Sequence, residues 1–449
     1  MKRIDFEHGS IPSNILNAAI PMLVAQLLSL LYNIIDRIYI ARIPHIGTTA
    51  LGAVGLCFPI IVIITAFSNL FGSGGAPLFS IRRGENNSRK ASEIMNTSYT
   101  MVCGGAIVLM VIGFLFARPI LRLFGASESA LVYAYPYLMI YLVGTLPSMI
   151  STGMNSFINA QGYATTGMTS VAIGAVANCI LDPVFIFVFS LGIRGAAIAT
   201  VISQTLSAAF VLYFLKKRSE LNVRFLTRSE LSQCTETAKN IISLGTAGFI
   251  MQLTNSLVSI CCNNVLSVTG GDIYISVMTI VSSIRQLVET PIYAINEGTS
   301  PIISYNYGAG ERGRVKRIFI TALIMIASIM FVGMLICLGF AGNLIGLFTK
   351  NSLTILDGAQ AVRIICMGFV ISAVSVTISG MLEALGRGVE SLILSLLRYV
   401  VVIIPAAFVL GKLFGGAAVW HCFWIAETIA SLTAIFLIYR RSPFTQTCR

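Results

Sequence analysis

The chain has 449 residues, of which 56% are hydrophobic and only 11% are charged, and its mean hydropathy is +0.85. A water-soluble fold of this length cannot bury so much apolar surface, so the composition excludes a soluble globular protein and indicates a chain that folds in a bilayer. The net charge of +12 is spread over short loops instead of one basic helix, which disfavours nucleic-acid binding.

Apolar runs of about 20 residues, long enough to cross a hydrocarbon core of ~30 Å as helices, recur along the whole chain. A membrane β-barrel would instead show alternating segments of ~10 residues. We therefore predict twelve transmembrane helices, at residues 14–40, 51–73, 95–117, 133–154, 165–189, 195–215, 241–266, 274–298, 317–340, 361–382, 389–411 and 416–439. The polar N-terminus lacks a small-residue cleavage site after a short apolar core, so we expect the first helix to be retained.

Positive charges are distributed unevenly between the two sides of the membrane on which alternate loops are predicted to lie. Twenty of the 30 lysines and arginines fall in the two termini and the even-numbered loops, and about eight fall in the odd-numbered loops and adjoining helix ends. By the positive-inside rule, this asymmetry predicts that both termini and the basic loops lie in the cytoplasm.

The sequence repeats with a period of about half its length. The segment Pro77–Gly84 (PLFSIRRG) aligns with Pro301–Gly308 (PIISYNYG), 224 residues later. Six helices per repeat start each half on the same side, so the halves are predicted to be parallel and related by an axis along the membrane normal. We predict an all-α membrane fold with two six-helix lobes around a central cleft, at residues 1–218 and 241–449, joined by a cytoplasmic loop at 219–240. A duplicated scaffold without transport activity is the alternative.

Acidic side chains inside membrane helices are costly, so each one is a candidate functional residue. Asp36 lies in the first predicted helix, and Tyr32 and Asn33 precede it by one turn and by three residues. All three can therefore share one face of the helix. The alternative for Asp36 is an ion pair with Arg37 or a place in water at the helix end.

A second polar cluster lies in the fifth predicted helix, where Asn178 precedes Asp182 by four residues. Pro183 has no backbone N–H, which leaves the carbonyl group of Cys179 without a helical partner. Carboxylate, amide and carbonyl oxygens suit a small cation such as Na+. Two carboxylates in one dry pocket could instead share a proton. The alternative for Asp182 is a cap at the outer end of the helix.

The second half of the chain carries charges of a different kind. Glu289 is expected to pair with Arg285, one turn before it, while Glu297 and Glu427 are assigned structural roles. Arg398 has no acid close to it in the sequence and is predicted to line the cleft.

Candidate side chains for binding a transported compound are mainly amides, because an amide inside a bilayer needs a polar partner. Methionine and aromatic residues can add a soft, adaptable wall. For each of these residues, packing or contact with lipid is the alternative. The predicted substrate cleft comprises Gln26, Tyr32, Asn33, Met154, Asn155, Gln161, Gln252, Asn255 and Arg398.

Three motifs together resemble the multidrug and toxic compound extrusion (MATE) family, in particular its DinF-like prokaryotic branch. They are the loop SYNYGAGERGRVK at residues 304–316, LYNIID at 31–36 and NCILDP at 178–183. The resemblance covers nearly the whole chain. It implies a twelve-helix, two-lobe fold in a prokaryotic cell membrane, and export of organic, often cationic, compounds in exchange for H+ or Na+.

The resemblance also implies a cation-coupling site in the N-terminal half, which maps onto Asp36, Asn178, Asp182 and Thr200. Pro21 falls at the helix bend typical of the family, and a proline inside a helix is by itself a candidate hinge. Other branches carry acidic residues in the seventh and tenth helices. Here the seventh predicted helix has none, and the tenth has none before Glu383 at its end. The resemblance therefore does not imply cation coupling in the C-terminal half.

We therefore predict a monomeric antiporter that works by alternating access, without a cofactor beyond the coupling ion. A flippase for lipid-linked sugars is the main alternative, and a major-facilitator carrier lacks its usual motif here. ATP coupling is disfavoured because the sequence has no Gly-x-x-x-x-Gly-Lys-Ser/Thr loop. An enzyme is disfavoured because the three histidines are scattered, and the ten cysteines are interpreted as apolar filler.

Overall fold

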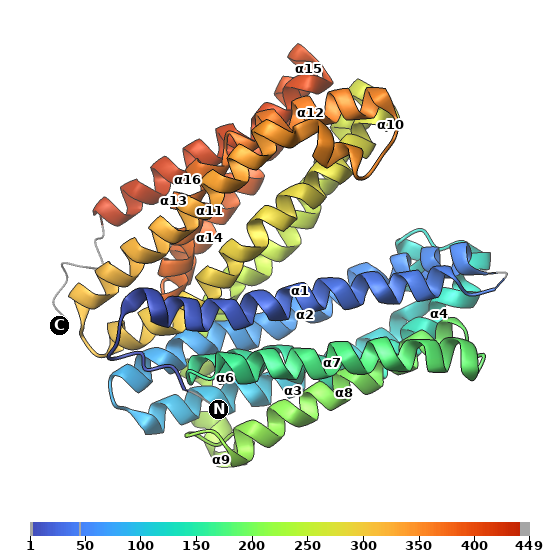
Figure 1. Cartoon of the computed structure of the whole chain (residues 1–449). Coiled ribbons are helices and arrows are strands. Elements are labelled where there is room, and N and C mark those ends of the chain that lie inside the picture. Colours follow the sequence, from blue (N-terminus) through green and yellow to red (C-terminus); the bar gives the residue numbers. More distant parts are fainter. Residues whose placement is uncertain (1–2, 45, 441–449) are drawn as a thin grey trace. The chain divides into compact units, whose positions relative to one another are not determined.

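A computed structural model describes residues 3–44 and 46–440, except for the side chains of Thr48, Arg228, Leu231, Asn255, Ser256 and Asp272. Within these residues every regular element is a helix (Figure 1). Helices are expected because a helix satisfies its backbone hydrogen bonds within one segment, as a bilayer requires. Interior prolines and long apolar stretches coexist in several of the helices.

The helices of the first half are α1 (Ile11–Ala41), α2 (Gly47–Gly84), α3 (Ser88–Leu123), α4 (Glu128–Val143), α5 (Thr145–Gly153), α6 (Asn155–Ala160), α7 (Ala164–Pro183), the π-helix η1 (Val184–Val188) and α8 (Ile193–Lys217). The short α9 (Arg228–Gln233) follows. The second half contains α10 (Thr235–Gly308), α11 (Arg312–Gly346), α12 (Ser352–Cys366), α13 (Phe369–Ala384), α14 (Gly388–Leu396), the π-helix η2 (Leu397–Ile403), α15 (Ile404–Phe414), the 3₁₀-helix η3 (Gly416–Trp420) and α16 (His421–Arg440).

Nine helices of the described residues are long and apolar enough to cross a membrane, and two bent helix pairs raise this number to eleven. The one predicted span not counted there is the eighth, 274–298, which is the second part of α10. This long element is interrupted at Gly271, whose φ of 68° and ψ of −159° are accessible to glycine and strained for other residues. The predicted boundary between the seventh and eighth helices falls at this kink.

The chain forms two compact units. The N-lobe runs up to Asp5 and continues from Ile20 to Gly245, and the C-lobe consists of Phe6–Ala19 and the chain from Thr246 onward. Both units therefore contribute to α1, because the division falls between Ala19 and Ile20.

Each lobe contains the same sequence of irregular features. The bent pairs are Glu128–Val143 with Thr145–Ala160, at 55°, and Ser352–Cys366 with Phe369–Ala384, at 50°. The pairs start 224 residues apart, at 128 and 352, as the sequence repeat requires. The next helices, α7 and α14, also start 224 residues apart, at 164 and 388, and each runs into a π-helix.

Close packing in the N-lobe depends on glycine where α2 crosses α5. A Cβ atom at Gly72 would lie 2.4 Å from the carbonyl oxygen of Gly153, which no side chain can accept without movement of one backbone. Small residues at such crossings let membrane helices approach closely, since lipid gives no hydrophobic drive for helix association.

Candidate functional site

The N-lobe brings together the four residues predicted to bind the coupling cation. Asp36 is on α1, Asn178 and Asp182 are on α7, and Thr200 is on α8. The Asn178 Nδ2 atom donates to Asp182 Oδ1 at 3.1 Å and to Thr200 Oγ1 at 3.4 Å. The carboxyl group of Asp36 lies close enough to that of Asp182 for the two groups to interact. Three separate helices thus converge on one polar cluster.

The cluster lies inside the lobe. Asp182 is 0% exposed and Asn178 is 3% exposed. Three buried oxygen atoms in it accept no hydrogen bond, namely Asp36 Oδ1, Asp182 Oδ2 and Asn178 Oδ1. Burying such acceptors without a partner is costly. This set of oxygens therefore fits a positively charged group that all three can contact.

Local backbone structure explains why Asp182 is buried instead of capping an exposed helix end. Pro183 has no N–H to continue the α-helical pattern, and α7 ends there. The chain then continues as the π-helix η1, so Asp182 lies within a continuous helical span. Arg37, the alternative partner considered for Asp36, lies over the Phe58 ring at 5.7 Å.

Pro21 lies within α1, two residues after the point where the helix passes from the C-lobe to the N-lobe. Its ring cannot donate a backbone hydrogen bond, so the helix is weakened at this division.

The predicted substrate-cleft residues differ in their surroundings. Met154 is 0% exposed, while Asn33 is exposed and donates to the Ser29 carbonyl at 2.7 Å. Asn155 donates to the Gly167 carbonyl at 3.3 Å, and its Oδ1 is buried without a partner. Gln26, Tyr32 and Gln252 are partly exposed, and the side chain of Asn255 lies outside the described residues.

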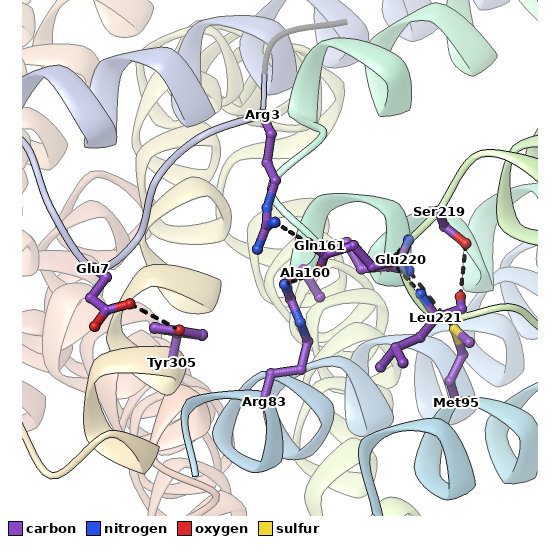
Figure 2. A network of polar contacts seen from close by, with 10 residues as sticks. All are labelled: Arg3, Glu7, Arg83, Met95, Ala160, Gln161, Ser219, Glu220, Leu221 and Tyr305. Carbon is purple, nitrogen blue, oxygen red and sulfur yellow. Dashed lines mark hydrogen bonds and ion pairs between the residues drawn. The ribbon is translucent and has the colours of Figure 1, made fainter. Parts of the chain in front are cut away.

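Gln161 belongs to a network that fixes the start of the inter-lobe loop (Figure 2). Its Oε1 accepts hydrogen bonds from the backbone N–H groups of Glu220, at 3.1 Å, and Leu221, at 3.4 Å. Arg83 donates to the Ala160 carbonyl at 2.9 Å and pairs with Glu220 at 2.6 Å. Arg3 also pairs with Glu220. The amide of Gln161 is therefore already engaged within the N-lobe.

In the C-lobe, Glu289 pairs with Arg285 at 3.1 Å, which confirms the expected pair. Arg398 is not isolated, because its Nε lies 3.4 Å from Glu427 on α16. No group of three or more His, Cys, Asp or Glu side chains suited to a metal ion occurs within residues 3–44 and 46–440.

The sequence pattern of the MatE family matches residues 21–184 and 248–409, well over half of the chain and parts of both lobes. The chain belongs to the MatE family. This finding confirms the family resemblance of the three sequence motifs.

Two relatives are similar to this chain over nearly its whole length. The multidrug export protein MepA of Staphylococcus saprophyticus is 27% identical over 439 residues, 97% of this chain and 95% of that protein. MepA of Staphylococcus haemolyticus is also 27% identical, over 97% of this chain and 94% of its own.

A solved structure described as the outward-facing conformation of a multidrug resistance MATE family transporter of the MOP superfamily superimposes with a TM-score of 0.90. It covers 100% of this chain and 99% of its own at 24% identity. This likeness confirms the predicted twelve-helix, two-lobe fold. As a member of the MatE family, the protein is a multi-pass membrane transporter.

One neighbour of the N-lobe cluster was not assigned to it from the sequence of this MatE protein. Tyr137 on α4 is 3% exposed and lies near both Asp36 and Asp182. It stacks with Tyr141 at 6.3 Å, and the Tyr141 hydroxyl accepts from Gln204 at 3.4 Å. A tyrosine inside an apolar helix marks Tyr137 as a possible functional residue, but nothing in the sequence indicates that it lies near Asp36 on α1 and Asp182 on α7.

Proposed function

We propose that this protein is a multidrug exporter of the cell membrane that exchanges organic, often cationic, compounds for H+ or Na+ by alternating access. The printed names of its MepA relatives, multidrug export proteins, support the substrate class. Both termini lie in the cytoplasm in this proposal, in accordance with the distribution of lysine and arginine, and the protein acts as a monomer.

The observation that carries the proposal is the set of three buried oxygens of Asp36, Asp182 and Asn178 without hydrogen-bond donors. Carboxylate, amide and hydroxyl oxygens are the ligands that small hard cations prefer, so Na+ would be held by these three residues and Thr200. H+ would be held between the two carboxyl groups, because two adjacent carboxylates repel each other unless a proton or a cation lies between them. Either ion satisfies the same oxygens.

Binding of the ion changes the charge of the N-lobe interior, and α1 carries this change toward the lobe boundary. Asp36 and Pro21 are on the same helix, so a shift of the Asp36 carboxyl group can bend or straighten α1 at the proline. Each net positive charge that a cycle moves inward gains about 2.3 kcal/mol per 100 mV of membrane potential, and an exported monocation offsets one inward charge. Exchange of one coupling ion for one monocation is therefore driven by the concentration gradient of the ion.

We propose that the two compact units move as lobes, that residues 1–218 and 241–449 supply most of each, and that residues 219–240 link them. Gln26, Tyr32, Met154, Asn155 and Gln252 remain proposed contacts for the exported compound. Gln161 has a mainly structural part in this proposal, because its amide oxygen binds the loop at Glu220 and Leu221.

The test is uptake of a fluorescent organic cation into proteoliposomes under a pH gradient or a Na+ gradient, each imposed separately. Asp36→Asn is expected to abolish gradient-driven uptake while the protein remains folded. Glu230→Gln is a matched control at an acid outside the membrane helices. Hydrogen bonds from Arg224 and then Thr227 lower the pKa of Glu230 to about 2, so this group exchanges no proton near neutral pH.

Full gradient-driven uptake by Asp36→Asn would contradict the assignment of the coupling site. Absence of uptake by the unchanged protein under both gradients would contradict the antiport proposal, and lipid-linked substrates would then be the next to test.

A further inference from the structure

The C-lobe contains a second group of charged residues that the proposed coupling cycle does not use. Arg285 and Glu289 on α10 pair at 3.1 Å, and Arg398 on η2 pairs with Glu427 on α16 at 3.4 Å. Ser375 on α13 links the second pair, since it accepts a hydrogen bond from Arg398 and donates one to Glu427 Oε2 at 3.2 Å. We call these four charged residues the C-lobe charge cluster.

The C-lobe charge cluster is partly open to the surface of its lobe. The exposed fractions of the side chains are 30% for Arg285, 25% for Glu289, 11% for Arg398 and 20% for Glu427. Charged side chains within membrane helices do not face lipid, because the cost is several kcal/mol each. The exposed part of the cluster is therefore expected to face a polar, water-accessible space.

The pair of Arg398 and Glu427 has unused hydrogen-bonding capacity. The Nε atom of Arg398 is buried and makes no hydrogen bond, although it lies 3.4 Å from Glu427. A guanidinium group presents donors in a planar fork that matches a carboxylate with two parallel bonds. Arg398 therefore does not make with Glu427 the two parallel hydrogen bonds that its guanidinium group could make with a free carboxylate.

The backbone at Arg398 also departs from regular helix. Arg398 is the second residue of the π-helix η2, and π-helical turns occur frequently at functional sites. Buried ion pairs add little net stability, because the cost of desolvating the charges offsets most of their attraction. Stabilisation of the fold alone therefore does not explain the cluster well.

We propose that the C-lobe charge cluster recognises zwitterionic compounds. The Arg398 guanidinium exchanges Glu427 for the carboxylate of the compound, and the released Glu427 carboxylate binds its cationic group. The four charges sum to zero before and after this exchange, so a zwitterion enters without leaving an unpaired charge in the membrane. This proposal rests on the proposed function as an exporter and names a substrate class for it.

The test compares two dyes that differ in one carboxylate, the zwitterion rhodamine B and its ethyl ester, which is a monocation. Binding to the purified full-length protein in detergent is measured by fluorescence anisotropy, which requires no ion gradient and no transport. In Arg398→Gln, affinity for the zwitterion relative to the ester should fall about tenfold or more, because a charged hydrogen-bonded partner is lost. In Glu427→Gln the same ratio should rise, since Arg398 then has no competing carboxylate.

Arg398→Lys keeps the charge and loses the planar fork, and it should give an intermediate ratio. It serves as the measured variant if Arg398→Gln is aggregated on size exclusion. Equal dye ratios in the unchanged protein, Glu427→Gln and the Arg398 variants would overturn the proposal, as would absence of zwitterion binding by the unchanged protein. Absence of gradient-driven uptake of an organic cation by the unchanged protein would instead contradict the proposed function, so the two failures are distinguishable.

Discussion

Asp36 and Asp182 meet in the interior of the N-lobe although 146 positions of sequence, from 36 to 182, separate them. The sequence made each acid a candidate on its own, because a carboxyl group in an apolar helix needs a partner. The family resemblance placed them in one site. Tyr137 was not predicted as their neighbour, since its proximity depends on how α4 packs within the N-lobe, against α2, α3 and α8.

The same limit explains Arg398. Its partner Glu427 is on another helix, 29 positions later, so no spacing of three or four residues indicates the pair. The pair of Arg285 and Glu289 was predictable because both residues share one face of a single helix.

At Thr200 we expect Thr200→Val to weaken the apparent affinity for a driving Na+ about tenfold without unfolding the protein. The hydroxyl group is one of the oxygens assigned to the cation, and loss of one hydrogen-bonding or coordinating group to a charge costs about 1.5–3 kcal/mol. The measurement is the dependence of dye uptake on Na+ concentration. H+-driven uptake should be little affected.

Thr205→Val is the matched control, because both hydroxyl groups donate to the carbonyl four residues earlier on α8 and Thr205 is exposed. Equal Na+ dependence in the two variants would remove Thr200 from the proposed site.

At the scale of single helices, most spans were predictable and most interruptions were not. Apolar runs indicated a helix at 133–154, but the structure bends by 55° between Val143 and Thr145. Gly144 at the break has φ and ψ values of −75° and −5°, in the right-handed region open to every residue, so the bend does not require glycine. The π-helices η1 and η2 were likewise not predicted, although Pro183 marks where the first begins.

For α1 we expect Pro21→Ala to lower the rate of uptake roughly tenfold under an unchanged gradient, while the thermal unfolding temperature stays equal or rises. Alanine restores the backbone hydrogen bond and stiffens the helix where it passes between lobes. Initial uptake rates and thermal unfolding are the measurements.

Pro59→Ala in α2 replaces another proline inside a helix and should leave the rate unchanged. A Pro21→Ala protein that transports at the rate of Pro59→Ala would exclude a hinge at this position.

At the crossing of α2 and α5 we expect Gly72→Ala to destabilise the N-lobe by about 1–3 kcal/mol or more, the usual cost of overpacking. The added Cβ atom would lie 2.4 Å from the Gly153 carbonyl oxygen. Thermal unfolding in detergent measures the effect as a lower transition temperature. Gly104→Ala on α3 adds a Cβ atom in open space and should not lower it. A Gly72→Ala protein as stable as Gly104→Ala would mean that the helices can separate without cost.

For the whole molecule, composition predicted a membrane protein, the length of the apolar runs predicted helices, and the 224-residue repeat predicted that both halves would have similar elements. The sequence did not predict that the division between compact units would fall inside α1. Residues 6–19 join the C-lobe through tertiary contacts, for example from the Asn306 side chain to the Phe6 carbonyl at 2.9 Å and from Arg314 to the His8 carbonyl at 3.2 Å. Such contacts leave no periodic signal in the sequence.

The most direct test of coupling follows the ion itself. In sealed proteoliposomes without an imposed gradient, external organic cation is added, and release of internal H+ or radioactive Na+ is recorded together with substrate uptake. The unchanged protein should release one of the two ions in fixed proportion to uptake. Asp36→Asn and Asp182→Asn should release neither, while Thr205→Val behaves as the unchanged protein does. Substrate uptake without ion release, or full ion exchange by Asp36→Asn, would contradict the assignment of these two carboxylates as the coupling site.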